Sequence, residues 1–136
     1  DTLEQIDISM EISSEFPFSN DVWPSDITFT LNGTELGTWT SPGDFADTRG
    51  KLNPSWWPSN LNQYGLLKTL RVTHHGTYMD GDPLSQVSIS DLNKTAETWE
   101  IRIEVKPDAE NVGGVTLFGK KFGNHDQDIN FKAYYS

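Results

Sequence analysis

The sequence contains no cysteine, no long apolar run and few basic residues, and each absence narrows what the protein can do. Without cysteine, the chain has no disulfide scaffold, no thiolate zinc site and no cysteine nucleophile. We expect a cytoplasmic protein, because a chain without cysteine suits a reducing compartment. No apolar stretch approaches the roughly 18 residues that a membrane-spanning helix requires. We therefore expect no membrane partner.

Basic residues are outnumbered by acidic ones, with 10 Lys and Arg against 20 Asp and Glu, which gives a net charge of −10. Because an acidic surface repels phosphate, we expect no direct contact between this chain and nucleic acid. The sequence also lacks the phosphate-loop, GxSxG and HExxH motifs. A glycosidase needs two carboxylates at a defined separation, and no motif indicates such a pair. We predict a non-enzymatic protein without a cofactor.

A helical spacing of apolar residues is missing as well, whereas alternation of apolar and polar residues is frequent. The alternation is regular in residues 6–12, 27–31 and 99–105, and shorter or less regular in residues 70–73, 87–89, 115–118 and 129–134. Asn32-Gly33 predicts a type I′ hairpin turn, and Asp80-Gly81 indicates a second turn. About eight strands with polar connections are typical of an all-β protein. We predict an antiparallel two-sheet β-sandwich of jelly-roll type.

The 136 residues have the size of one domain, and no composition shift divides the range 1–136. Because the chain opens at Asp1 without a methionine, we expect it to be part of a longer protein. The alternation stops between Ser41 and Leu67. A loop of this length in a compact domain is usually functional or disordered. Its aromatic residues argue against disorder, so we predict one long ordered loop.

Two adjacent tryptophans stand in this loop, within the sequence KLNPSWWPSNLNQY. Pro58 restricts Trp57 to an extended conformation. If Trp56 is extended too, the two indoles point in opposite directions. We therefore predict that one indole anchors the loop and that the other is exposed. Two interpretations stay open: both indoles close the end of the core, or one is a stacking platform for a sugar ring.

Polar side chains near the tryptophans would complete a sugar site, because sugar hydroxyl groups need hydrogen-bonding partners at the rim. In this interpretation one indole stacks on the ring, and the neighbouring polar residues bind the hydroxyls. Trp39 is out of phase with Leu36, so one of the two faces away from the core. An outward Trp39 would join the platform, and an inward one would pack across the sheet. The predicted ligand-binding residues are Trp56, Trp57, Asp47, Arg49, Asn60, Tyr64 and Trp39.

Three stretches together carry a resemblance to one protein family: NDVWPSDITFTLNGTELGTWTSPGDF, TRGKLNPSWWPSNLNQYGLLKTLRV and NVGGVTLFGKKFGNHDQDI. Over nearly its whole length the chain resembles the C-terminal part of bacterial ArsR-like helix-turn-helix transcriptional regulators. The resemblance implies a cytoplasmic effector domain that follows an N-terminal DNA-binding helix-turn-helix in the same full-length protein. The metal-sensing cysteines associated with ArsR are absent, so metal sensing is not implied. More loosely, the chain resembles the β-sandwich carbohydrate-binding modules.

Three further clusters have simpler interpretations. His74 and His75 would point to opposite faces of a strand and could not readily chelate one ion. Asp80 and Asp126 lie in turns with oxygen ligands for calcium, but neither turn matches an EF-hand, and we predict no metal site. Lys120-Lys121 lies between glycines without a phosphate-loop motif. We expect the glycines to mark a bulge or corner, and the two lysines to contact an acidic ligand or the DNA-binding half.

The sequence as a whole predicts a non-enzymatic effector domain that binds a small polar ligand such as a saccharide. Ligand binding would change the operator affinity of the attached helix-turn-helix. Two alternatives remain. One is a dimerisation or protein-docking module, in which the loop aromatics anchor an interface and the chain forms a homodimer. The other is a carbohydrate-binding module of a larger enzyme.

Overall fold

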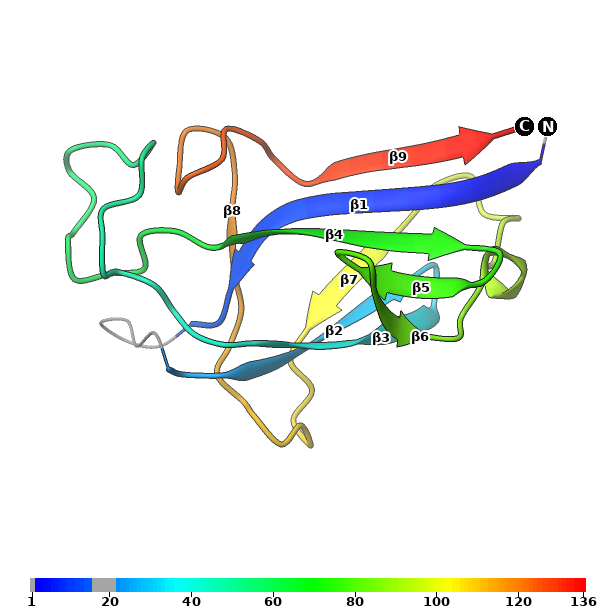
Figure 1. Ribbon diagram of the computed structural model, residues 1–136, viewed down its shortest axis with the longest axis horizontal. Coiled ribbons are helices and arrows are strands. Elements are labelled where there is room, and N and C mark those ends of the chain that lie inside the picture. The colour runs from blue at the N-terminus through cyan, green and yellow to red at the C-terminus, as the bar shows by residue number, and fades with distance from the viewer. Residues whose placement is uncertain (1, 16–21) are drawn as a thin grey trace.

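The computed structural model describes residues 2–15 and 22–136, so the first residues of the NDVWPSD stretch lie outside the described part. Two antiparallel sheets form the all-β fold predicted from the sequence (Figure 1). One short 3-10 helix, η1 (Ile89–Asp91), accompanies the strands within the described ranges. The strands are β1 (Leu3–Ser13), β2 (Ser25–Leu31), β3 (Thr34–Ser41), β4 (Leu66–Thr73), β5 (Gly76–Met79), β6 (Asp82–Ser85), β7 (Ile101–Glu104), β8 (Thr116–Phe118) and β9 (Asn130–Tyr135).

The larger sheet has six strands and is organised around β1. Its order is β6-β5-β4-β1-β8, and β9 also pairs with β1. β8 and β9 share β1 because they pair with different parts of it, residues 11–13 and residues 3–9. β1 therefore extends from the two chain ends toward the end of the sandwich that carries the long loop (Figure 1). At the chain ends, Thr2 and Ser136 exchange two backbone hydrogen bonds of 3.2 and 2.9 Å.

The smaller sheet has the order β3-β2-β7 and confirms the predicted hairpin. Asn32 and Gly33 have φ values of 47° and 82°, as a type I′ turn requires. A bulge follows in β3, because Phe29 pairs with Gly37 while Thr30 pairs with Glu35. The extra residue is Leu36.

The prediction that either Leu36 or Trp39 faces away from the core is wrong, because of this bulge. Leu36 is fully buried, and Trp39 packs against the same core cluster. A bulge changes the alternation by one residue, so two residues three positions apart can share a face. Trp39 also lies under the Lys68 ammonium group, 5.3 Å from the ring centroid.

The core lies between the two sheets and is supplied by the alternating residues. β1 contributes Ile6, Ile8, Met10 and Ile12, and β2 contributes Ile27, Phe29 and Leu31. All of them are at most 1% exposed. Burial of one such side chain contributes about 1.5–3 kcal/mol, so this face-to-face packing is the main support of the fold.

Two local predictions differ from the structure. Residues 87–89 do not form a strand, because η1 begins at Ile89. The hairpin of β5 and β6 follows His74-His75, which lie in a turn and not in a strand. The Asp80-Gly81 turn joins β5 and β6 as expected, with positive φ at both residues. The jelly-roll connectivity stays a prediction, since the strand order establishes two antiparallel sheets and no more.

Candidate ligand-binding site

The long loop, residues 42–65, folds back on itself beyond the end of the sandwich opposite the chain ends (Figure 1). Its two arms meet where Phe45 and Tyr64 form an isolated bridge and stack at 5.2 Å between ring centroids. The side chain of Asn62 holds this base to β1, because its amide donates to the Ser13 hydroxyl at 2.7 Å. Its oxygen accepts the Phe45 N–H at 3.1 Å. The loop is thus attached at its base by side chains as well as by the backbone.

Gln63 organises the inside of the loop and is 1% exposed. Its oxygen accepts hydrogen bonds from the Gly50 N–H at 3.2 Å and from the Asn53 amide at 3.0 Å. Its nitrogen donates to the carbonyls of Pro58 at 2.7 Å and Leu61 at 3.2 Å. Because all four bonds run to different parts of the loop, one buried amide fixes its path.

Glu11 of β1 joins a second turn to this loop. Its carboxylate is fully buried and accepts the Gly65 N–H at 2.9 Å. It also accepts the N–H groups of Asn124 and His125, both at 2.9 Å. A buried carboxylate is tolerated only where such donors surround it. Glu11 therefore links the end of the long loop, β1 and the segment after β8 at one point.

The segment after β8 contains a turn at residues 119–123, here called the lysine turn. The Phe122 N–H closes it onto the Gly119 carbonyl at 3.3 Å, and the Asn53 side chain accepts the Gly123 N–H at 2.6 Å. The Leu52 N–H donates to the Gly123 carbonyl at 2.8 Å. The lysine turn and the long loop are thus hydrogen-bonded side by side.

Three rings gather where these segments meet, and we call Trp56, Trp57 and Phe122 the aromatic ledge. The ring centroids of Trp56 and Trp57 are 5.7 Å apart, and Phe122 lies 6.4 Å from Trp56 and 5.6 Å from Trp57. Trp57 is half-buried, and its indole N–H donates to the Asn62 carbonyl at 2.9 Å. Trp56 is 69% exposed. One indole therefore anchors the loop, and the other faces solvent.

The predicted opposite orientation of the two indoles is wrong. The backbone N–H of Trp57 donates to the Pro54 carbonyl at 2.9 Å, which places Trp56 inside a turn. Alternation of side chains holds only for consecutive extended residues. Both rings consequently pack against Phe122.

Two of the other predicted polar residues support the loop with their side chains. Arg49 donates to the carbonyls of Trp57 and Pro54, so its guanidinium holds the tryptophan turn. Asp47 accepts the Tyr64 hydroxyl next to the base of the loop. Asn60 is exposed in the loop. Trp39 belongs to β3 and the core, and within residues 2–15 and 22–136 no ring contact joins it to the ledge.

A pocket of about 490 Å³ lies beside the ledge, and half of its lining residues are candidates from the sequence. Phe122 belongs to both the ledge and the pocket. The proximity of residues 52–54 to residues 120–126 comes from the Glu11 and Asn53 contacts, which join positions far apart in the chain. The lining residues are Leu52, Pro54, Lys120, Lys121, Phe122 and Asp126.

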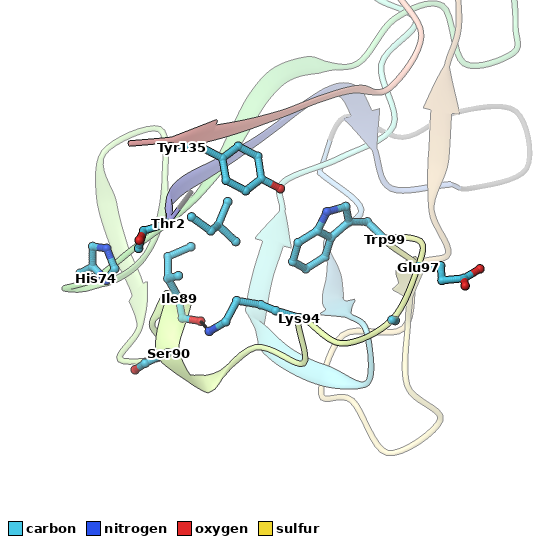
Figure 2. A pocket seen from close by; sticks show the side chains of 10 residues that line it. Thr2, His74, Ile89, Ser90, Lys94, Glu97, Trp99 and Tyr135 are labelled. Atoms are coloured by element: carbon cyan, nitrogen blue, oxygen red, sulfur yellow. Dashed lines mark hydrogen bonds between the residues drawn. The ribbon is translucent and has the colours of Figure 1, made fainter.

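A second pocket, of about 570 Å³, lies near the chain ends (Figure 2). In Figure 2 Tyr135 lies above Lys94 and Trp99 lies to the right, and the Lys94 ammonium donates to the Ile89 carbonyl at 3.0 Å. His74 also lines it and lies 2.8 Å from the Glu4 carboxylate. Hydrogen bonds from Ser136 and His74 hold the pKa of Glu4 below its usual value.

The acidic side chains of the two turns at Asp80 and Asp126 accept hydrogen bonds from neighbouring segments of the chain. Asp80 accepts the Thr69 N–H at 2.8 Å and pairs with Lys68 at 3.0 Å. Asp126 accepts the Lys121 N–H at 3.1 Å. Across the described ranges, no three His, Asp or Glu side chains gather in a way that could hold a metal ion. In the same ranges no helix has the length and apolar character to cross a bilayer.

The chain matches no family model, no curated protein and no solved structure. The resemblance to helix-turn-helix regulators therefore stays a prediction that depends on the quoted residues alone.

Proposed function

We propose that this domain is a non-enzymatic ligand-binding module and that a saccharide stacks on Trp56 at the aromatic ledge. The observation that carries the proposal is the contrast between an indole 69% exposed and the rigid support beneath it. A sugar ring offers an apolar C–H face that fits an aromatic plane, and an exposed indole supplies that plane. Hydroxyl groups at the ring edge would find Asp126 and Asn60 as partners.

The support beneath Trp56 favours binding because it lowers the entropic cost. Ordering a flexible side chain or loop on binding costs about 0.5–1.5 kcal/mol per side chain. Here Gln63, Arg49 and the Trp57 indole already fix the turn that carries Trp56. A ligand would meet a surface that is organised before it arrives.

A regulatory role follows from the resemblance and is part of the proposal. A helix-turn-helix joined to the N-terminus would meet β1 at Leu3, whereas the ledge is linked to β1 at Glu11. β1 is one continuous strand between these points. Ligand binding at the ledge would be communicated along β1 to the helix-turn-helix, because it would favour one arrangement of the effector domain and the helix-turn-helix over another.

The same exposed indole also suits the competing function, a dimerisation or docking module. Trp is enriched among residues that dominate protein interfaces. Analytical ultracentrifugation separates the two functions. A concentration-dependent dimer that Trp56→Ala converts to a monomer would favour docking and count against the saccharide proposal.

The test of the proposed function is calorimetric titration with a panel of neutral and acidic oligosaccharides. We expect Trp56→Ala to weaken binding at least about ten-fold, as the loss of a central aromatic anchor does. Tyr135→Ala is the matched control, because Tyr135 is 58% exposed but lines the other pocket. No binding by the intact domain, or binding lost in Tyr135→Ala and kept in Trp56→Ala, would overturn the proposal.

A further inference from the structure

The pocket beside the ledge is lined by two neighbouring basic residues. Lys120 and Lys121 both line it, together with the Phe122 ring of the ledge. The pocket volume of about 490 Å³ lies within the range of small-molecule sites, roughly 300–1,000 Å³. A ligand on Trp56 that extends past Phe122 would therefore reach both lysines.

The backbone at these lysines is fixed. The Lys120 N–H donates to Asp128 at 3.0 Å, and the Lys121 N–H donates to Asp126 at 3.1 Å. Lys121 has a φ of 69°, a left-handed conformation that is uncommon for a lysine. Such a conformation persists only where the surroundings enforce it, and it is often found at binding sites.

Among the residues that the structure describes, no ion pair includes either ammonium group. The basic partners in the ion pairs of the described residues are Lys68, Arg71, His74, Arg102 and Lys106. Neither Lys120 nor Lys121 is among them, although the chain has twice as many acidic as basic residues. Two adjacent lysines without an ion pair place two positive charges next to each other at this turn.

We infer that the ligand of the ledge is a carboxylated saccharide, with Lys120 and Lys121 binding the carboxylate of a uronic acid unit. This inference depends on the proposed function and names the class of saccharide. Ammonium–carboxylate hydrogen bonds are charge-assisted and stronger than neutral ones. The apolar side of the pocket, formed by Leu52, Pro54 and Phe122, would pack against the sugar ring.

The charge balance of the pocket favours a monoanion. Two lysines and Asp126 give the lining a net charge of +1 if all three are ionised. A single carboxylate matches this charge, whereas a phosphate monoester carries nearly two negative charges and would be repelled by Asp126. Asp126 would instead accept a hydrogen bond from a sugar hydroxyl.

The experiment compares uronic acid trisaccharides of the galacturonate, glucuronate and mannuronate series with their carboxyl-reduced, neutral counterparts. For at least one series, we expect the acid to bind more tightly than its neutral counterpart. We expect Lys120→Gln and Lys121→Asn each to reduce that preference about two- to five-fold, the range of exposed ion pairs. Asparagine is chosen because it tolerates the positive φ of Lys121. Lys132→Gln, an exposed lysine on β9, is the control and should change nothing.

The outcomes distinguish this inference from the proposed function. If acid and neutral forms bind equally and Trp56→Ala abolishes both, the saccharide site stands and the carboxylate assignment is wrong. The assignment also fails if the Lys120→Gln, Lys121→Asn double variant keeps the full preference. If no trisaccharide binds, or if binding is indifferent to Trp56→Ala, both proposals fall. Raising the salt concentration to about 0.5 M should reduce the preference, because screening weakens exposed charge pairs.

Discussion

Replacement of Glu11 by glutamine removes one charge and almost no volume, and it tests how the ligand site is held together. In the native domain, one carboxylate oxygen accepts the Gly65 and Asn124 N–H groups at 2.9 Å each. The other accepts the His125 N–H at 2.9 Å and the Asn124 N–H at 3.1 Å. In Glu11→Gln an NH₂ group replaces one of these oxygens. Whichever way the amide turns, its nitrogen faces at least one backbone donor.

The loss can be estimated from the bonds that the amide cannot make. Each oxygen accepts two N–H groups, and the Asn124 N–H is shared by both, so the substitution removes one hydrogen bond to a charged group outright and leaves the remaining ones to a neutral acceptor. Such bonds contribute about 1.5–3 kcal/mol each. The neutral amide is easier to bury than a carboxylate, which offsets part of this loss. We expect a net destabilisation of about 2–4 kcal/mol, a large part of the roughly 5–15 kcal/mol typical of a domain.

Urea denaturation measures this change. With a slope of about 1–3 kcal/mol per molar, the midpoint should fall by about 1–2 M in Glu11→Gln. Glu97→Gln is the control, since Glu97 is exposed, and its midpoint should not move. A change below about 0.5 kcal/mol in Glu11→Gln, the size of an ordinary surface substitution, would refute the reasoning. Glu11 would then not be the link between the long loop and the lysine turn.

Two further substitutions test the fold around the site. Gly65→Ala would place a Cβ 2.7 Å from the Ile12 carbonyl oxygen, so we expect the free energy of unfolding to fall by about 1–3 kcal/mol in thermal denaturation. Ser59→Ala, at an exposed position, is the control and should leave it unchanged. A Gly65→Ala variant as stable as the wild type would show that β4 can move away from β1. The bidentate hydrogen bond from Arg71 lowers the pKa of Asp7, so its carboxylate stabilises the fold above its usual titration range and loses this effect on acidification. Urea midpoints of wild type and Asp7→Asn should therefore converge below about pH 4, and a constant difference down to pH 2.5 would contradict the assignment.

The sandwich was predictable because each main strand carries a local alternating pattern. Ile6 to Ile12 needs only its own sequence to define a buried face, and Asn32-Gly33 defines its turn in two residues. β5 and β6 were missed because four residues are too few to show a period. Residues 87–89 were misread for the same reason, since a three-residue alternation fits a strand and a 3-10 turn equally well.

The candidate site was predictable only in part. The isolated tryptophan pair in a polar loop indicated Trp56 and Trp57, and the predicted division into anchor and exposed indole agrees with their burial. Their orientation depends on a turn at Pro54 that no motif marks. Phe122 and the support from Glu11 could not be predicted, because contacts between residues 65 to 114 positions apart leave no local pattern. The assignment of Trp56 as a ligand-binding residue stays a prediction.

The most direct test of the central claim follows the indole N–H resonances of the five tryptophans during titration with a uronic acid trisaccharide. The resonance of Trp56, the most exposed indole, should shift saturably. Trp57, whose N–H is bound to the Asn62 carbonyl, should shift less, and Trp99 in the other pocket should not move. A shift at Trp99 with Trp56 unchanged, or no shift at any tryptophan, would contradict the claim that the aromatic ledge binds an acidic saccharide.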